Sequence, residues 1–146
     1  MKRASIILQL VIVSLLMTAS LALANRFEID PLIKQALKVV PKGAELIASQ
    51  GGEGSAFVAY TSGEQNYQFT LSSDLDPQIP DAKKFKYKDK DTFYFRPGAR
   101  DIGGLMIILN PEKSLVIVYS ANTPENKKVT LEIMVQIADK MDLDKI

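Results

Sequence analysis

The densest group of charged side chains in this sequence is a set of lysines that alternates with aromatic residues. Five lysines fall within residues 83–90. Because successive side chains of a strand point to opposite faces, Lys84, Lys86 and Lys88 are predicted to share one exposed face. Such a row of ammonium groups suits an anionic polymer or an acidic protein surface. The alternative is a solvated sheet edge whose lysines prevent aggregation.

A second group of charges lies in the glycine-containing segment 96–104, which holds Arg96, Arg100 and Asp101. Guanidinium groups bind carboxylates and phosphates through paired hydrogen bonds, and binding residues commonly lie on loops between strands. The alternative is that Asp101 pairs with one of the arginines and only rigidifies the turn. The candidate binding residues are therefore Lys84, Lys86, Lys88, Arg96, Arg100 and Asp101.

Three aspartates share the Pro-containing segment 72–84. Carboxylates close together can ligate calcium, but the glycine and the glutamate that an EF-hand loop requires are not at their places. Asp74, Asp76 or Asp101 could instead serve as the acid or base of a small hydrolase. The sequence does not fix the separation that such a pair needs, so we predict a hydrophilic surface loop and no metal or cofactor.

The composition excludes most familiar catalytic centres. The 146 residues include no His, Cys or Trp, so a Ser-His-Asp triad, a cysteine nucleophile, a zinc finger and a disulfide framework are all impossible. The Gly-rich segment 50–55 lacks the lysine ending of a phosphate-binding loop. Without residues 1–24 the chain has 16 Lys and Arg against 17 Asp and Glu, and this near-neutral charge argues against nucleic-acid binding.

The first 24 residues have the pattern of a secretory signal peptide. Lys2 and Arg3 precede a nearly continuous apolar run, and Ala22-Leu23-Ala24 supplies the small residues of a cleavage site. We expect cleavage after Ala24, export to the periplasm or beyond, and no membrane span in the mature chain. An uncleaved membrane anchor is the alternative. Residues 25–146 are expected to form a single domain.

Apolar periodicity predicts the elements that position these residues. A helix is expected from a cap at Asp30, with Pro31 in its first position, to Val40. A second helix is expected from a cap at Thr123, with Pro124 first, through Met141. Between them, period-two alternation and short apolar runs predict strands near residues 44–49, 56–60, 67–71, 84–88, 92–96, 105–109 and 114–119.

This order predicts an α+β fold: an antiparallel meander of about six or seven strands, flanked by an N-terminal and a C-terminal helix packed on one face. The other face is expected to be partly wet or used for binding. The leading functional prediction is a small exported, non-catalytic protein that binds another envelope protein or an anionic envelope polymer. The alternatives are a carboxylate-dependent hydrolase acting on an envelope glycan, and a structural component of a secretion or adhesion assembly.

Overall fold

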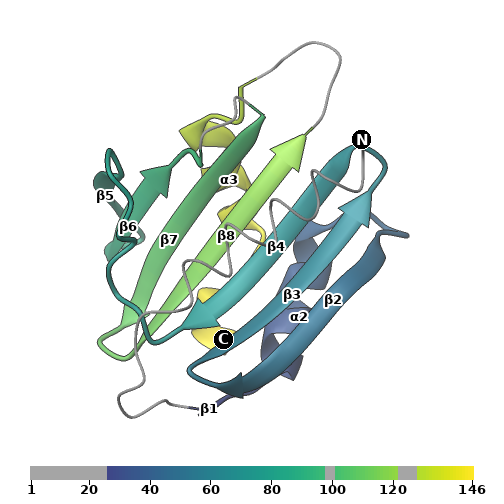
Figure 1. Ribbon diagram of the computed structural model, residues 1–146, viewed down its shortest axis with the longest axis horizontal. Coiled ribbons are helices and arrows are strands. Elements are labelled where there is room, and N and C mark those ends of the chain that lie inside the picture. The colour runs from purple at the N-terminus through teal and green to yellow at the C-terminus, as the bar shows by residue number, and fades with distance from the viewer. Residues whose placement is uncertain (1–25, 98–100, 122–127) are drawn as a thin grey trace.

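The alternating segments of the chain form one antiparallel sheet of eight strands (Figure 1). The computed structural model describes residues 26–97, 101–121 and 128–146. Its elements are β1 Arg26–Phe27, α2 Ile29–Val39, β2 Glu45–Glu53, β3 Ser55–Ser62, β4 Gln65–Ser72, β5 Lys83–Tyr87, β6 Lys90–Phe95, β7 Ile102–Asn110, β8 Lys113–Ala121, α3 Leu131–Asp139 and the short 3-10 helix η1 Leu143–Lys145.

The sheet is built from two meanders placed side by side. Strands β2 to β4 form one and β5 to β8 form the other, and they join where β4 pairs with β8, which gives the order β1-β2-β3-β4-β8-β7-β6-β5. At this seam Tyr67 lies opposite Tyr119, with ring centroids 5.0 Å apart. The chain that leaves β4 in the middle of the sheet must therefore cross to β5 at the far edge.

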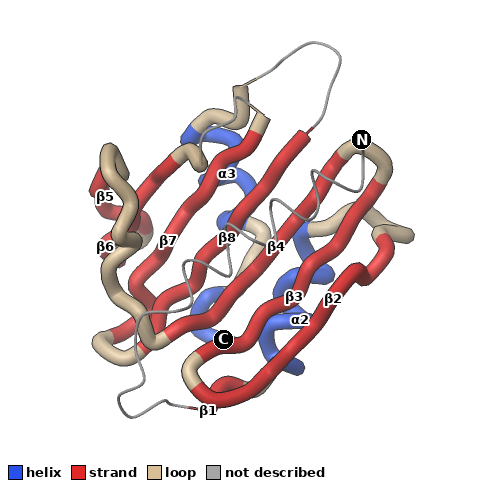
Figure 2. Tube along the Cα trace, viewed as in Figure 1, coloured by secondary structure: helices blue, strands red, loops and turns tan. Residues whose placement is uncertain are grey.

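Both helices lie behind the sheet in the view of Figure 2, so the molecule has two layers. One core lies between them and includes Leu32 and Ala36 of α2, Met134 of α3 and Phe69 of β4, all fully buried. The period-two alternation of β4 explains this, because Tyr67, Phe69 and Leu71 face the helices and the residues between them face away. The prediction of an α+β fold with an antiparallel sheet and two helices is confirmed. The prediction of a single meander is wrong, because β4 pairs with β8 and not with β5.

Specific polar contacts attach the helices to each other and to the sheet. Gln35 of α2 is 3% exposed, and its Oε1 accepts a hydrogen bond from the Asp142 backbone N–H at 2.8 Å. The Tyr94 hydroxyl donates to the Val129 carbonyl at 2.8 Å, just before α3. Gly103 allows α3 to approach the sheet, since a Cβ there would lie 2.6 Å from a methyl carbon of Val129.

Several predicted boundaries differ from the structure. The sheet has one more strand than expected, because the two residues of β1 pair with Gly52 and Glu53. Strand β2 also continues through the glycines that were predicted to form a turn, and the reversal occurs at Gly54, whose φ is 79°. The seven predicted strands are all present with shifted ends. Most are longer than predicted because pairing with a neighbour extends a strand beyond its alternating residues, whereas β5 and β6 each end one residue early.

The helix starts also differ from the predicted ones. Helix α2 begins at Ile29 with Glu28 as its N-cap, so neither Asp30 nor Pro31 has its predicted position. Proline is tolerated there because the first-turn N–H groups have no partner within a helix. Helix α3 begins only after Thr130, whose hydroxyl accepts from the Ile133 N–H. The predicted cap at Thr123 lies outside the described residues, as does the predicted signal segment 1–24; no helix in the described ranges is long and apolar enough to cross a membrane.

Candidate functional site

Two of the predicted binding lysines lie together on β5, but they share a carboxylate. Asp91 of β6 lies 2.7 Å from the Lys86 ammonium and 3.2 Å from that of Lys84. Hydrogen bonds from Lys86 and Lys84 hold the pKa of Asp91 below its usual value. The pairing follows from the register, because Lys86 is directly opposite Asp91. Asp91 therefore compensates one of the two positive charges of this pair.

The prediction that Lys88 continues this row is wrong. Strand β5 ends at Tyr87, and Lys88 lies in the following turn with a φ of 48°. Its ammonium is 3.5 Å from the Asp139 carboxylate of α3 and 5.1 Å from the centre of the Tyr87 ring. The Tyr87 hydroxyl donates to the same carboxylate at 2.6 Å. Lys88 thus attaches the β5–β6 turn to α3 instead of joining Lys84 and Lys86.

The segment after β6 contains the other predicted binding residues. Arg96 is half-buried, and its Nε is shielded from water. Asp101 is also half-buried, and its backbone carbonyl accepts from the Ala121 N–H at 3.1 Å, which ties the start of β7 to the end of β8. Arg100 lies outside the described residues. The predicted pairing of Asp101 with an arginine therefore stays a prediction.

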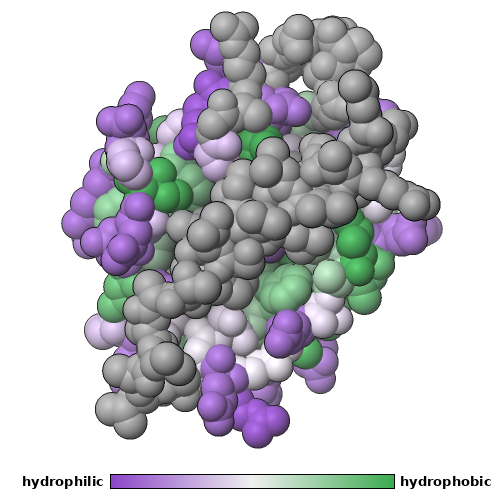
Figure 3. Space-filling view, viewed as in Figure 1, coloured by the Kyte–Doolittle hydropathy of each residue, from purple (hydrophilic) through white to green (hydrophobic). Residues whose placement is uncertain are grey.

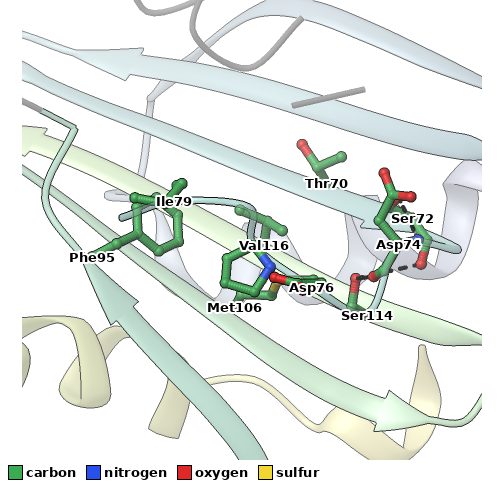
Figure 4. Close-up of a pocket in the computed structure, with 10 residues that line it drawn as sticks. Thr70, Ser72, Asp74, Asp76, Ile79, Phe95, Met106, Ser114 and Val116 are labelled. Atoms are coloured by element: carbon green, nitrogen blue, oxygen red, sulfur yellow. Dashed lines mark hydrogen bonds between the residues drawn. The ribbon is translucent and has the colours of Figure 1, made fainter. Parts of the chain in front are cut away.

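The acidic loop 73–82 forms a pocket that the sequence did not predict (Figure 4). This loop connects β4 to β5 across the sheet face opposite the helices, and the pocket lies between the loop and that face. Its volume is about 420 Å³ including the open mouth. Phe95 and Ile79 stand together at one end of the group in Figure 4, and Ser72, Asp74 and Ser114 stand together at the other. The pocket therefore has an apolar end and a polar end.

Hydrogen bonds fix the loop at its polar end. The Ser114 hydroxyl donates to the Asp74 carbonyl at 2.6 Å, and the Asp74 N–H donates to the Ser72 hydroxyl at 3.0 Å. Further along, the Asp76 carboxylate accepts from the Gln78 N–H at 3.0 Å, which shapes a tight turn. One lining group lacks such a contact: Thr70 is 3% exposed, and its buried hydroxyl has no hydrogen-bond partner.

The two edges of the sheet differ in how they are protected. The outer edge of β5 carries lysines, which discourage pairing with another strand. The outer edge of β2 pairs with β1 only at Gly52 and Glu53, and no other described strand covers it. Between Glu45 and Glu53 this strand has no charged side chain. Its Leu46 and Ile47 are 48% and 38% exposed.

Helix α2 begins beside the end of this edge and carries further apolar side chains. The Cβ of Ile29 lies near Gly51 of β2, which places the start of the helix beside the end of the strand. Ile33 and Leu37 follow at four-residue intervals on the same side of the helix. Leu37 lies eight residues after Ile29, about 12 Å further along the helix axis, and is 57% exposed. Figure 3 shows a hydrophobic area at the right of the view, over the beginning of β2.

The sequence contained partial signals for these two sites. The sheet face opposite the helices was predicted to be partly wet or used for binding, and on β4 its residues Gln68, Thr70 and Ser72 are buried. Pro77 and Ile79 are apolar residues of the acidic loop that line the pocket. The open edge of β2 depends on the strand order, which local alternation does not reveal.

Within the described ranges, no three carboxylates are grouped in a way that could hold a metal ion. The chain as a whole matches no protein-family model, no curated protein and no solved structure.

Proposed function

We propose that this protein is an exported, non-catalytic binding protein of the bacterial envelope, and that it binds an extended segment of another envelope protein along the outer edge of β2. Export rests on the signal pattern of residues 1–24. The absence of His and Cys from the sequence supports a binding role over catalysis by the common nucleophile–base pairs.

The observation that carries the proposal is the open edge of β2. Backbone N–H and C=O groups along an unpaired edge are available for a ladder with an added strand. The exposed side chains of Leu46 and Ile47 lie on that strand and supply apolar contacts. An added strand would thus gain main-chain hydrogen bonds together with burial of apolar surface.

A separate extended segment suits this edge better than a second copy of the chain. The pairing of β2 with β3 is irregular between Leu46 and Ala48, so Ile47 is an extra residue on β2. Two β2 edges related by a twofold axis would bring both irregularities into the same short stretch and interrupt the ladder. A flexible segment without a bulge can follow one irregular edge.

The anionic polymer is the less favoured of the two predicted partners. Lys84 and Lys86 share Asp91, and Lys88 pairs with Asp139. A polyanion would have to compete with these carboxylates, and its binding would weaken as salt screens the remaining charge.

Capture from envelope extract with three variants tests the proposal. L46K/I47K adds two charges to the open edge at exposed positions, so the fold should persist. Its matched control is L75K, because Leu75 is 37% exposed on the loop at the other face of the sheet. K84E/K86E tests the lysines of β5. Hydrogen exchange of the purified complex then measures protection of the β2 amides.

The expected result is a protein retained at high salt by the wild type, L75K and K84E/K86E but lost by L46K/I47K, with new protection confined to β2. Retention of the same protein by L46K/I47K would overturn the proposal. Material retained only at low salt, and lost by K84E/K86E, would assign the binding to an anionic polymer at β5 instead.

A further inference from the structure

We propose that the pocket beneath loop 73–82 binds a small organic cation with an apolar tail, such as an alkylammonium group. This site lies on the sheet face opposite the helices and uses β4, β6, β7 and β8. It is separate from the β2 edge, so the inference does not depend on the partner proposed above.

The charged side chains that line the pocket favour a positively charged ligand. Among the described residues that line the pocket, Asp74 and Asp76 carry carboxylates and none is Lys, Arg or His. A cation is attracted to such a lining, whereas an anion meets like charge. The described carboxylates are not grouped for a metal ion, and the apolar residues of the same lining are unsuited to one. An organic cation satisfies both features.

The apolar end of the pocket favours a ligand with a hydrocarbon chain. Phe95, Met106, Val116 and Ile79 present apolar side chains, and burying a short hydrocarbon chain against them is favourable. The pocket volume of about 420 Å³, open mouth included, is near the lower limit for small-molecule sites and suits a short hydrocarbon chain.

Thr70 provides the independent sign that a ligand belongs here. Its side chain lines the pocket, and it is 3% exposed with a hydroxyl that has no hydrogen-bond partner. Burying a hydroxyl without a partner is unfavourable, and native proteins rarely keep such a group. An ammonium group carries three N–H donors, and the Thr70 oxygen has lone pairs to accept one.

The loop that forms the roof is held in place before any ligand binds. Hydrogen bonds from Ser114 to Asp74 and from Asp74 to Ser72 anchor its first part, and Pro77 is buried beneath it. A preformed pocket loses little conformational entropy on binding. Even a weak, fragment-sized ligand should therefore give a measurable signal.

The test is a titration of the full mature chain with hexylammonium, followed by amide NMR, with hexanoate and hexanol as probes of the same length. Hexylammonium should shift the amides of the lining residues, and the other two should bind at least tenfold more weakly. I79W fills the pocket from the loop, where Ile79 is half-buried, and should abolish binding. L75W adds the same bulk to an exposed position that does not line the pocket and should leave binding unchanged.

T70V separates a ligand-binding role of Thr70 from a simple packing defect, because valine keeps the shape and removes the hydroxyl. We expect T70V to raise the melting temperature and to weaken hexylammonium binding about tenfold. Equal binding of all three probes, binding that survives I79W, or T70V that binds as the wild type would each overturn the inference. L46K/I47K should bind hexylammonium normally, so failure of one proposal is distinguishable from failure of the other.

Discussion

Gly104 and Phe95 offer a sharp test of how the sheet supports the pocket. They lie opposite each other on β7 and β6, and the Phe95 ring covers the space where Gly104 lacks a side chain. A Cβ at Gly104 would lie 2.7 Å from Cδ2 of Phe95 and still closer to Cε2 and Cζ. Because Phe95 is 3% exposed, its ring cannot turn out to solvent without losing its contacts.

Replacing Gly104 by Ala should therefore destabilise the fold by overpacking. The expected cost is about 1–3 kcal/mol, reduced by roughly 0.4–1 kcal/mol because alanine restricts the unfolded chain more than glycine does. A net loss of about 1–2 kcal/mol corresponds to a melting temperature lower by about 4–8 °C for a chain of this size. The displaced ring would also alter the pocket, so hexylammonium binding should fall.

Chemical and thermal unfolding of a double-mutant cycle measures this interaction. Phe95→Leu removes Cε2 and Cζ, the ring atoms nearest the added methyl group. Leucine keeps a Cδ atom near the added methyl group, so Gly104→Ala should then cost less than in the wild type without becoming neutral. Gly52→Ala is the matched control, since nothing lies within 4 Å of a Cβ at that position. If Gly104→Ala is as costly in the Phe95→Leu background as in the wild type, the clash assigned to the ring is wrong.

Three further predictions concern the other face of the sheet and the helices. Burial, with a smaller contribution from Tyr119, raises the pKa of Tyr67 to about 12; the folded state therefore keeps the proton that the unfolded chain loses above pH 10. The contribution of Tyr67 to stability should be constant below pH 10 and fall as the pH rises toward 12, and urea unfolding over that range should show a shallower fall for Tyr67→Phe. Thr130→Ala removes the cap of α3 and should cost about 1 kcal/mol, whereas an unchanged urea midpoint would show that the cap is not needed. Gln35→Leu leaves the Asp142 N–H without its partner and should cost about 1–3 kcal/mol; rapid hydrogen exchange at that amide would confirm the loss, and exchange as slow as in the wild type would contradict it.

Local sequence patterns predicted correctly the elements whose apolar pattern continues over many residues. The strands around Phe69 and Ile117 alternate or run apolar over many residues, and tertiary packing reinforces what their sequences favour. Strand β1 was not predicted because two residues hold no period, and they are ordered as a strand by pairing with Gly52 and Glu53. The start of α3 was misplaced because Tyr94 holds the Val129 carbonyl in extended chain, which residue-by-residue propensity does not include.

The candidate sites were harder to predict because they depend on contacts between distant segments. A period of two places Lys88 with Lys84 only while the strand continues, and the turn at Lys88 ends that alternation. The pocket beside the Thr70 hydroxyl exists only because loop 73–82 crosses the sheet. That loop is held by a contact between Asp74 and Ser114, which are 40 residues apart in the sequence. No local pattern in the sequence indicates that β4 and β8 are neighbours.

The contrast between the two edges also limits what kind of assembly the protein can form. A sheet with two open edges can add partners on both sides and grow into a fibre. Here the lysines of β5 oppose pairing on one side, and β1 covers the last two residues of β2 on the other. The open stretch from Glu45 to Gly51 has room for one strand of about seven residues. We therefore expect a complex with a single partner segment, and a stoichiometry of one to one distinguishes it from a polymer.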